Sequence, residues 1–185
     1  KTNYIFEFID LGGGMGISYE KNNKKLNFKI YNALINKFLI KNKCKIIFEP
    51  GRSIIGNAGI LISKVIYIKK NKNKSFVILD AAMNDLMRPA LYGAKHQIIP
   101  SKKNKKITNK IFEFVGPICE STDKFLTTKK FQNIREGELI IICDVGAYGM
   151  SLSSNYNVRT LPAEILVKNS KMQVIKSRQK LSDII

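Results

Sequence analysis

Apolar residues recur at helical spacing in one long segment of the chain. Between residues 26 and 41 they fall every four positions and at neighbouring ones, at Leu26, Ile30, Leu34, Ile35, Phe38 and Leu39. This spacing gathers them on one face and predicts an amphipathic helix over Leu26–Lys41. Apolar strands flank the helix at Tyr4–Ile9 and Cys44–Phe48. The order strand, helix, strand is typical of a parallel βαβ unit.

After Arg52 the pattern changes to short, Ile-rich strands separated by Gly, Pro, Asn and Lys clusters. The expected strands are Ile60–Ile68, Phe76–Leu79, Ile111–Val115, Leu139–Cys143, Ala163–Val167 and Met172–Ile175. No second helix as long as the first is expected, only a short one near the carboxyl terminus. Segments of this length and spacing favour a mostly antiparallel β domain, so the predicted fold class is α/β followed by all-β.

Polar clusters follow the first two strands. Gly12–Gly14 expose backbone N–H groups that can cradle a phosphate, although sharp turns use glycine too. The second strand runs into Glu49-Pro50-Gly51-Arg52, where the proline extends the acid and the arginine offers a planar fork of donors for an anion. Taken alone, this stretch fits a surface Arg–Glu pair equally well. Because parallel strands end on one rim, we expect both loops in one ligand site.

Three further clusters carry candidate chemistry. Arg88 and Tyr92 lie four residues apart, so a helical turn would aim a guanidinium and a phenol the same way; the alternative is a surface turn with a packed tyrosine. Cys119 and Glu120 follow a Gly-Pro turn, and Cys119 is the candidate reactive thiol because it lies outside an apolar run. Tyr148 stands between glycines with little local packing, which favours a ligand role.

The remaining cysteines, Cys44 and Cys143, are expected in the core, and His96 is expected to have a satisfied structural role. Three cysteines without a CxxC pair predict neither a disulfide framework nor a metal site. The compartment is therefore expected to be reducing, hence cytoplasmic. No apolar run reaches the length of a membrane span, and no signal-peptide pattern precedes the first strand.

The formal net charge of +18 raises the question of nucleic-acid binding. Five of the 32 basic residues are arginines, and many lysines lie in Lys/Asn runs such as Lys69–Lys74 and Lys102–Lys106. We interpret these runs as solvated loop tips, since no aromatic residues interleave with them for base stacking. RNA binding is the minor alternative. The arginines within the clusters, Arg52, Arg88 and Arg159, are candidates for anion binding because lysine cannot copy their bidentate contacts.

Together and in order, these clusters resemble the carboxyl-terminal half of the diaminopimelate decarboxylase family, fold-type III pyridoxal-phosphate decarboxylases related to the ornithine and arginine decarboxylases. The resemblance implies an alanine-racemase-like (β/α)8 barrel followed by a β domain. Residues 1–56 would supply the last part of the barrel and 57–185 the β domain. It further implies pyridoxal 5'-phosphate as cofactor, decarboxylation of meso-2,6-diaminopimelate to L-lysine and CO2, no membrane, and a homodimer with shared active sites.

The resemblance also implies residue roles. The cofactor-binding residues would be Gly14, Glu49, Pro50, Gly51, Arg52 and Tyr148, and the substrate-binding residues Arg52, Arg88, Tyr92, Glu120 and Tyr148. Glu49 would pair with the pyridine nitrogen and keep it protonated, so that the ring accepts the electrons left when CO2 departs. Cys119 would donate the proton that quenches the carbanion, from a loop that reaches into the partner subunit's site.

One family feature has no match in the chain, namely the Schiff-base lysine near the start of the barrel. This piece alone is therefore expected to be inactive. A related ornithine- or arginine-type decarboxylase and a non-catalytic decarboxylase-like binding protein are the alternatives. The Arg88–Tyr92 cluster favours diaminopimelate, because a buried guanidinium left unpaired by the wrong substrate is costly.

Overall fold

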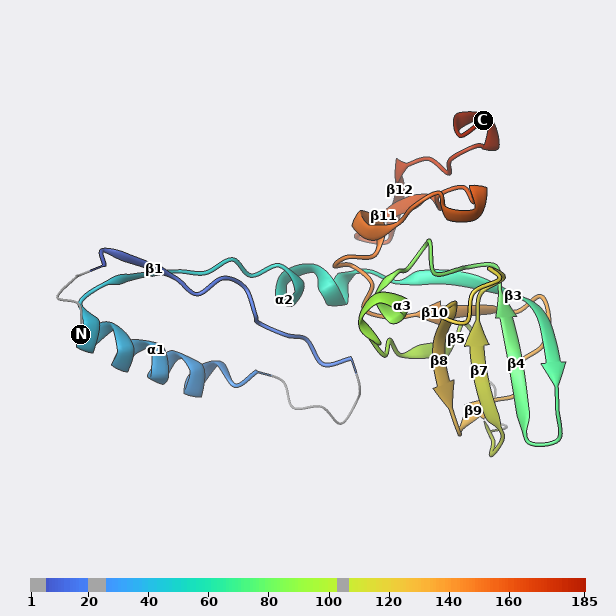
Figure 1. Ribbon diagram of the computed structural model, residues 1–185, viewed down its shortest axis with the longest axis horizontal. Coiled ribbons are helices and arrows are strands. Elements are labelled where there is room, and N and C mark those ends of the chain that lie inside the picture. Colours follow the sequence, from blue (N-terminus) through green and yellow to red (C-terminus); the bar gives the residue numbers. More distant parts are fainter. Residues whose placement is uncertain (1–5, 20–25, 103–106) are drawn as a thin grey trace.

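The amino-terminal part of the chain forms a parallel strand pair with one long helix beside it. The computed structural model describes residues 6–19, 26–102 and 107–185. Strand β1 (Phe8–Asp10) pairs in parallel with β2 (Lys45–Ile47), and α1 (Phe28–Asn42) connects them. The predicted βαβ unit is thus confirmed, apart from residues 4 and 5 of its first strand, which lie outside the described residues. Figure 1 shows this unit extending away from the main sheet.

Helix α1 begins at Phe28, slightly after the predicted start at Leu26. The Asn27 side chain accepts hydrogen bonds from the backbone N–H groups of Lys29 and Ile30, which caps the first turn. None of the helix residues is buried, and Leu34 and Ile40 are 62% and 80% exposed. Within the described chain, much of the apolar face of α1 is therefore exposed, although Ile35 and Leu39 are partly buried.

The main sheet has six strands in the order β5 (Ile98–Pro100), β10 (Leu139–Ile142), β3 (Leu61–Lys70), β4 (Lys74–Leu79), β7 (Ile111–Val115) and β8 (Lys124–Thr128). Neighbours are antiparallel except β4 and β7, which run in parallel with Lys74 opposite Ile111. The long connection over residues 80–110 makes this crossover, because parallel neighbours cannot be joined by a tight hairpin. The sheet is curled (Figure 1).

The hydrophobic core lies on one face of this sheet. Burial alternates along β4 and β7, as expected for strands with one covered face. The core includes Val65, Val77, Leu79, Leu86, Phe114, Phe125, Ile140 and Ile142. Cys44 and Cys143, which we expected in the core, are only partly buried. Cys44 adjoins the two-stranded sheet, whose residues are exposed or only partly buried, and Cys143 lies just beyond the end of β10.

Short elements complete the fold. Strands β6 (Ile107–Thr108) and β9 (Phe131–Gln132) pair, as do β11 (Glu164–Lys168) and β12 (Lys171–Lys176). Helices α2 (Arg52–Ile55) and α3 (Arg88–Tyr92) are single turns, and 3-10 turns cover Gly56–Ala58, Met150–Leu152, Tyr156–Val158 and Leu181–Asp183. The last of these lies where a short helix was expected.

The fold is thus mostly β, with a curled sheet and few helices. Strands β5, β6, β8 and β9 were not predicted. The lysine run over 69–74 lies at the turn between β3 and β4, as expected of a loop tip, whereas residues 103–106 of the other run lie outside the described residues. A domain boundary at residue 56 remains a prediction. No helix in the described part of the chain is long and apolar enough to cross a bilayer.

Candidate active site

A cavity of about 550 Å³ lies where the ends of β1 and β2 meet α3 and the loop after β10. Of the residues predicted to bind cofactor or substrate, it is lined by Gly14, Glu49, Gly51, Arg52, Arg88, Tyr92 and Tyr148. These residues come from four separate stretches of sequence. The structure therefore brings most of the predicted site together, with both signs of charge around one space.

The glycine loop and the loop after β2 are joined through their backbones. The backbone N–H of Glu49 donates to the Gly12 carbonyl oxygen at 2.9 Å, and that of Leu11 donates to the Ile47 oxygen at 3.0 Å. A Cβ atom at Gly13 would lie 2.7 Å from the Glu49 carbonyl oxygen, so the close approach requires glycine. The two strand ends therefore hold the Glu49 carboxylate beside a loop with no side chain in the way.

The loop after β10 brings Tyr148 to the same cavity. The backbone N–H groups of Val145 and Gly146 donate to the carbonyl oxygens of Gly59 and Gly56, each at 3.0 Å. A side chain at Gly146 would collide with the Ile55 carbonyl oxygen. Tyr148 itself has a φ of 60°, a left-handed conformation that is unfavourable for a bulky residue. Such strain is typical of positions that serve a ligand site.

Arg88 is 5% exposed and opens α3, from which Tyr92 faces the same cavity. Its Nη1 donates to the Tyr19 hydroxyl oxygen at 2.5 Å and lies 3.2 Å from His96 Nε2. Its Nε is a buried nitrogen without a hydrogen-bond partner among the described residues. An unpaired donor on a buried guanidinium is costly, so this nitrogen is a candidate for contact with a bound anion.

Three predicted residues lie outside this cavity. Pro50 is half-buried beside it, and Cys119 and Glu120 are exposed on the loop between β7 and β8. The buried Asp123 carboxylate holds that loop, because its two oxygens accept from the backbone N–H groups of Met83 at 2.7 Å and Ile118 at 2.8 Å. Burial raises the pKa of Asp123, and the two hydrogen bonds oppose this shift.

Glu120 has a partner on a different element. It accepts a 2.5 Å hydrogen bond from the Tyr156 hydroxyl, and this bond to a carboxylate raises the pKa of the Tyr156 phenol. Arg159, a candidate for anion binding, is instead bound by protein groups: its Nε donates to Asn84 Oδ1 at 3.0 Å and its Nη2 to the Asp80 carbonyl oxygen at 2.5 Å. Its carboxylate neighbour is Asp85, at 3.8 Å.

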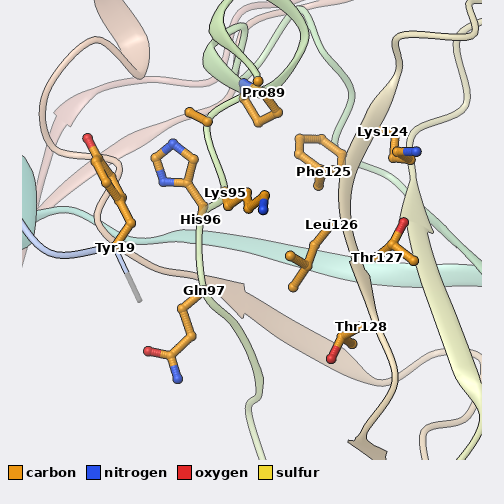
Figure 2. A pocket seen from close by; sticks show the side chains of 12 residues that line it. Tyr19, Pro89, Lys95, His96, Gln97, Lys124, Phe125, Leu126, Thr127 and Thr128 are labelled. Carbon is orange, nitrogen blue, oxygen red and sulfur yellow. The ribbon is translucent and has the colours of Figure 1, made fainter. Parts of the chain in front are cut away.

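His96 has the satisfied structural position expected of it, since both ring nitrogens have partners. Sequence reasoning missed Met15, Tyr19 and Ala94 as lining residues of the cavity. Tyr19 could have been flagged only as an aromatic residue shortly after the glycine cluster. It also lines a second cavity of about 650 Å³ on the far side of His96, in which Lys95, Lys124 and strand β8 take part. Figure 2 shows the Tyr19 and His96 rings next to each other in that cavity.

The chain belongs to the pyridoxal-dependent decarboxylases, because residues 6–146 match the family's pattern for "Pyridoxal-dependent decarboxylase, C-terminal sheet domain". Its similarity to diaminopimelate decarboxylases is more specific. It is 41% identical to that enzyme of Aquifex aeolicus over 187 residues, which cover 100% of this chain and 44% of the relative. The chain thus spans less than half the length of the curated relatives it matches.

Two solved structures show the same likeness. The Helicobacter pylori diaminopimelate decarboxylase complexed with L-lysine has a TM-score of 0.86 and 42% identity, covering 96% of this chain and 43% of that one. The M. jannaschii diaminopimelate decarboxylase in co-complex with L-lysine has a TM-score of 0.88 and 37% identity, covering 96% and 42%. Groups of acidic, His and Cys side chains suited to a metal ion are absent from the described residues.

Proposed function

We propose that this chain is the carboxyl-terminal part of a pyridoxal-phosphate-dependent decarboxylase that converts meso-2,6-diaminopimelate to L-lysine and CO2. The observation that carries the proposal is the buried Arg88, which lines a cavity shared with Glu49 and Arg52 and whose Nε has no hydrogen-bond partner among the described residues. That cavity offers one carboxylate and two guanidinium groups. A phosphorylated cofactor with a basic ring nitrogen and a substrate with a distal carboxylate together match this set of charges.

The donors present fit pyridoxal phosphate. Gly14 and Gly51 leave backbone approach to the cavity unobstructed, and Arg52 adds a cation suited to the phosphate. Glu49, which precedes Pro50, supplies a carboxylate for the ring nitrogen, and Tyr148 lines the same cavity. When bound, the cofactor supplies an electron sink for the bond to the departing carboxylate. By keeping the ring nitrogen protonated, Glu49 strengthens that sink.

The substrate end of the site is assigned to Arg88, Arg52 and Tyr92. Tyr19 and His96 hold Arg88 through Nη1, its Nε has no partner among the described residues, and the residue lines the cavity. A carboxylate can accept from two N–H groups of a guanidinium at once. Ornithine and lysine substrates of related decarboxylases have no carboxylate at this end. They would leave the buried guanidinium unpaired, which is how we expect the site to discriminate.

Cys119 and Glu120 are assigned to the active site of a second copy of the chain. Both are exposed on a loop that Asp123 fixes, and neither lines the cavity of its own chain. In the proposed homodimer Cys119 donates a proton to the carbon from which CO2 has left, and Glu120 meets the substrate's distal amino group. A thiol and a carboxylate presented outward on a rigid loop are suited to these tasks.

The first 56 residues are assigned to the last part of a (β/α)8 barrel. The parallel pairing of β1 with β2 and the largely exposed apolar face of α1 support this assignment, since barrel strands and helices have these features. The complete enzyme, meaning this chain joined to the amino-terminal half that its relatives possess, would supply the lysine that anchors the cofactor.

The proposal is tested on the complete enzyme by following CO2 release from meso-diaminopimelate. Arg88→Ala should raise KM for the substrate at least about tenfold, as expected for loss of a charged hydrogen-bonding partner, while cofactor affinity measured by absorbance changes little. Arg135→Ala, which removes an exposed arginine that does not line the cavity, is the matched control. Equal loss of substrate and cofactor affinity in Arg88→Ala would refute the assigned role. Faster turnover of ornithine than of diaminopimelate would refute the substrate.

A further inference from the structure

We propose that Tyr19 and His96 are positioning residues that orient the Arg88 guanidinium toward the substrate's distal carboxylate by accepting its Nη1 hydrogens. The inference rests on the function proposed above. It assigns a positioning role to two residues of the cavity walls that take no direct part in the reaction. Tyr19 lines both cavities, His96 lines only the larger one, and Arg88 only the smaller one. The three side chains together form the partition between the two spaces.

The hydrogen-bond partners of His96 fix which ring nitrogen carries the proton. Its Nδ1 lies 2.9 Å from the carbonyl oxygen of Cys143, a group that only accepts. Its Nε2 lies 3.2 Å from Arg88 Nη1, a group that only donates. The imidazole must therefore hold its hydrogen on Nδ1 and present a lone pair from Nε2 to the guanidinium. A fully buried ring with both nitrogens assigned cannot rotate without breaking one of these contacts.

Tyr19 takes the other Nη1 hydrogen. Its hydroxyl oxygen accepts from Arg88 Nη1 at 2.5 Å, and its ring packs edge-on against the His96 ring with 4.9 Å between centroids. The Arg88 guanidinium carbon lies 5.0 Å from the centre of the Tyr19 ring. Figure 2 shows the two rings adjacent, on different segments of the chain. Tyr19 and His96 thus hold the same guanidinium nitrogen from two sides.

The consequence concerns the other edge of the guanidinium. With both Nη1 hydrogens engaged, the edge formed by Nε and Nη2 is left for a ligand, and Nε is the buried nitrogen without a partner. That edge presents two parallel N–H groups, which matches a carboxylate in the bidentate arrangement. Because Nε has no partner among the described residues and Nη1 is held on two sides, the guanidinium is preorganised before substrate arrives.

The arrangement also depends on pH. Burial lowers the pKa of His96, and the Arg88 charge lowers it further; the hydrogen bond to Cys143 and the Asp144 carboxylate act in the opposite direction. The other ionisable groups around the ring are the Tyr19 phenol and, along the larger cavity, Lys95 and Lys124. A proton on Nε2 would turn the acceptor into a donor facing Arg88. Binding of a distal carboxylate should therefore weaken as the pH falls through the lowered pKa of His96.

The test uses two probes and the complete enzyme loaded with pyridoxal phosphate. L-Lysine keeps the carboxylate that the proposed reaction does not remove, and cadaverine is the same chain without a carboxylate. Their Kd values are measured by isothermal titration calorimetry for the unaltered enzyme and for Arg88→Ala, His96→Ala, His96→Gln and Tyr19→Phe. Thermal unfolding of each variant reports whether it folds.

We expect Arg88→Ala to weaken L-lysine binding by about 100-fold, and His96→Ala and Tyr19→Phe by about 5- to 20-fold, with cadaverine nearly unaffected. His96→Gln should recover to within about threefold, because its amide can donate to Cys143 and accept from Arg88. Lowering the pH should weaken L-lysine binding in the unaltered enzyme more than in His96→Gln. Should His96→Ala fail to fold, Tyr19→Phe and the pH comparison decide.

The outcomes separate the inference from the proposed function. An unaltered enzyme that does not bind L-lysine, or an Arg88→Ala variant that binds it normally, overturns the proposed substrate. If Arg88→Ala loses affinity but Tyr19→Phe and His96→Ala keep it, the function stands and the positioning role is overturned. An equal loss for L-lysine and cadaverine also overturns that role, since it points to general damage to the cavity.

Discussion

Replacement of Asp123 tests whether one buried carboxylate holds the loop that carries Cys119. Asp123 is 3% exposed, and each of its oxygens accepts one backbone N–H. Asp123→Ala leaves the amides of Met83 and Ile118 unpaired, at about 1–3 kcal/mol each. Burial of the charge, which raises the pKa of this carboxyl, offsets part of the loss. We therefore expect the free energy of unfolding to fall by about 3 kcal/mol.

Asp123→Asn is the matched control, because one amide oxygen keeps one of the two hydrogen bonds. It should cost about half as much as the alanine variant. Urea denaturation, followed through the unfolding of the sheet, gives the free energy of unfolding of each variant. Hydrogen exchange of the 116–123 segment shows whether the loop opens. Turnover should fall in both variants through the displaced thiol. A loss below about 1 kcal/mol, or equal losses for alanine and asparagine, would refute the role of the paired hydrogen bonds.

Three other changes have distinct expected outcomes. Gly13→Ala would place a Cβ 2.7 Å from the Glu49 carbonyl oxygen, so cofactor Kd measured by absorbance should rise at least about tenfold; unchanged affinity would contradict the close approach. Cys119→Ala should slow CO2 release while the cofactor stays bound, whereas Cys44→Ala should leave the rate unchanged. Equal rates for the two variants would refute the assignment of Cys119 as the proton donor. Burial raises the pKa of Asp85 above its usual 3.8, so the folded state binds the extra proton and its stability falls as pH rises through that raised pKa. Asp85→Asn should flatten this slope in urea titrations, and an unaltered slope would contradict the assignment.

The sequence pattern predicted the elements with long, regular spacing and missed those without it. Helix α1 was found because its apolar residues recur along four turns, and β7 because Ile111–Val115 is a short, mostly apolar run between Lys/Asn and Gly-Pro clusters. Strands β6 and β9 have two residues each, too few to show a period. In β8 the run Lys-Phe-Leu-Thr-Thr contains only two apolar residues. These strands are defined by pairing with distant segments, which no local pattern records.

Most residues chosen for the candidate site lie together in the structure, while their roles stay predictions. Glu49, Arg52, Arg88 and Tyr148 were selected for their chemistry, and all four line one cavity. The residues behind them were not selected. Tyr19 carries no local signal, since its importance arises from contact with Arg88, 69 positions away in the sequence. The parallel pairing of β4 with β7 was likewise hidden, because the connection between them has no long helical pattern.

The left-handed backbone at Tyr148 implies that this position lowers the stability of the fold in exchange for a role in the cavity. A tyrosine there carries a penalty of about 1–2 kcal/mol that asparagine or glycine would largely avoid. Selection for stability alone would favour its replacement, so we expect a ligand contact in the cavity that it lines to be what keeps the tyrosine. A laboratory evolution experiment rewarding heat resistance without turnover should therefore lose this side chain early.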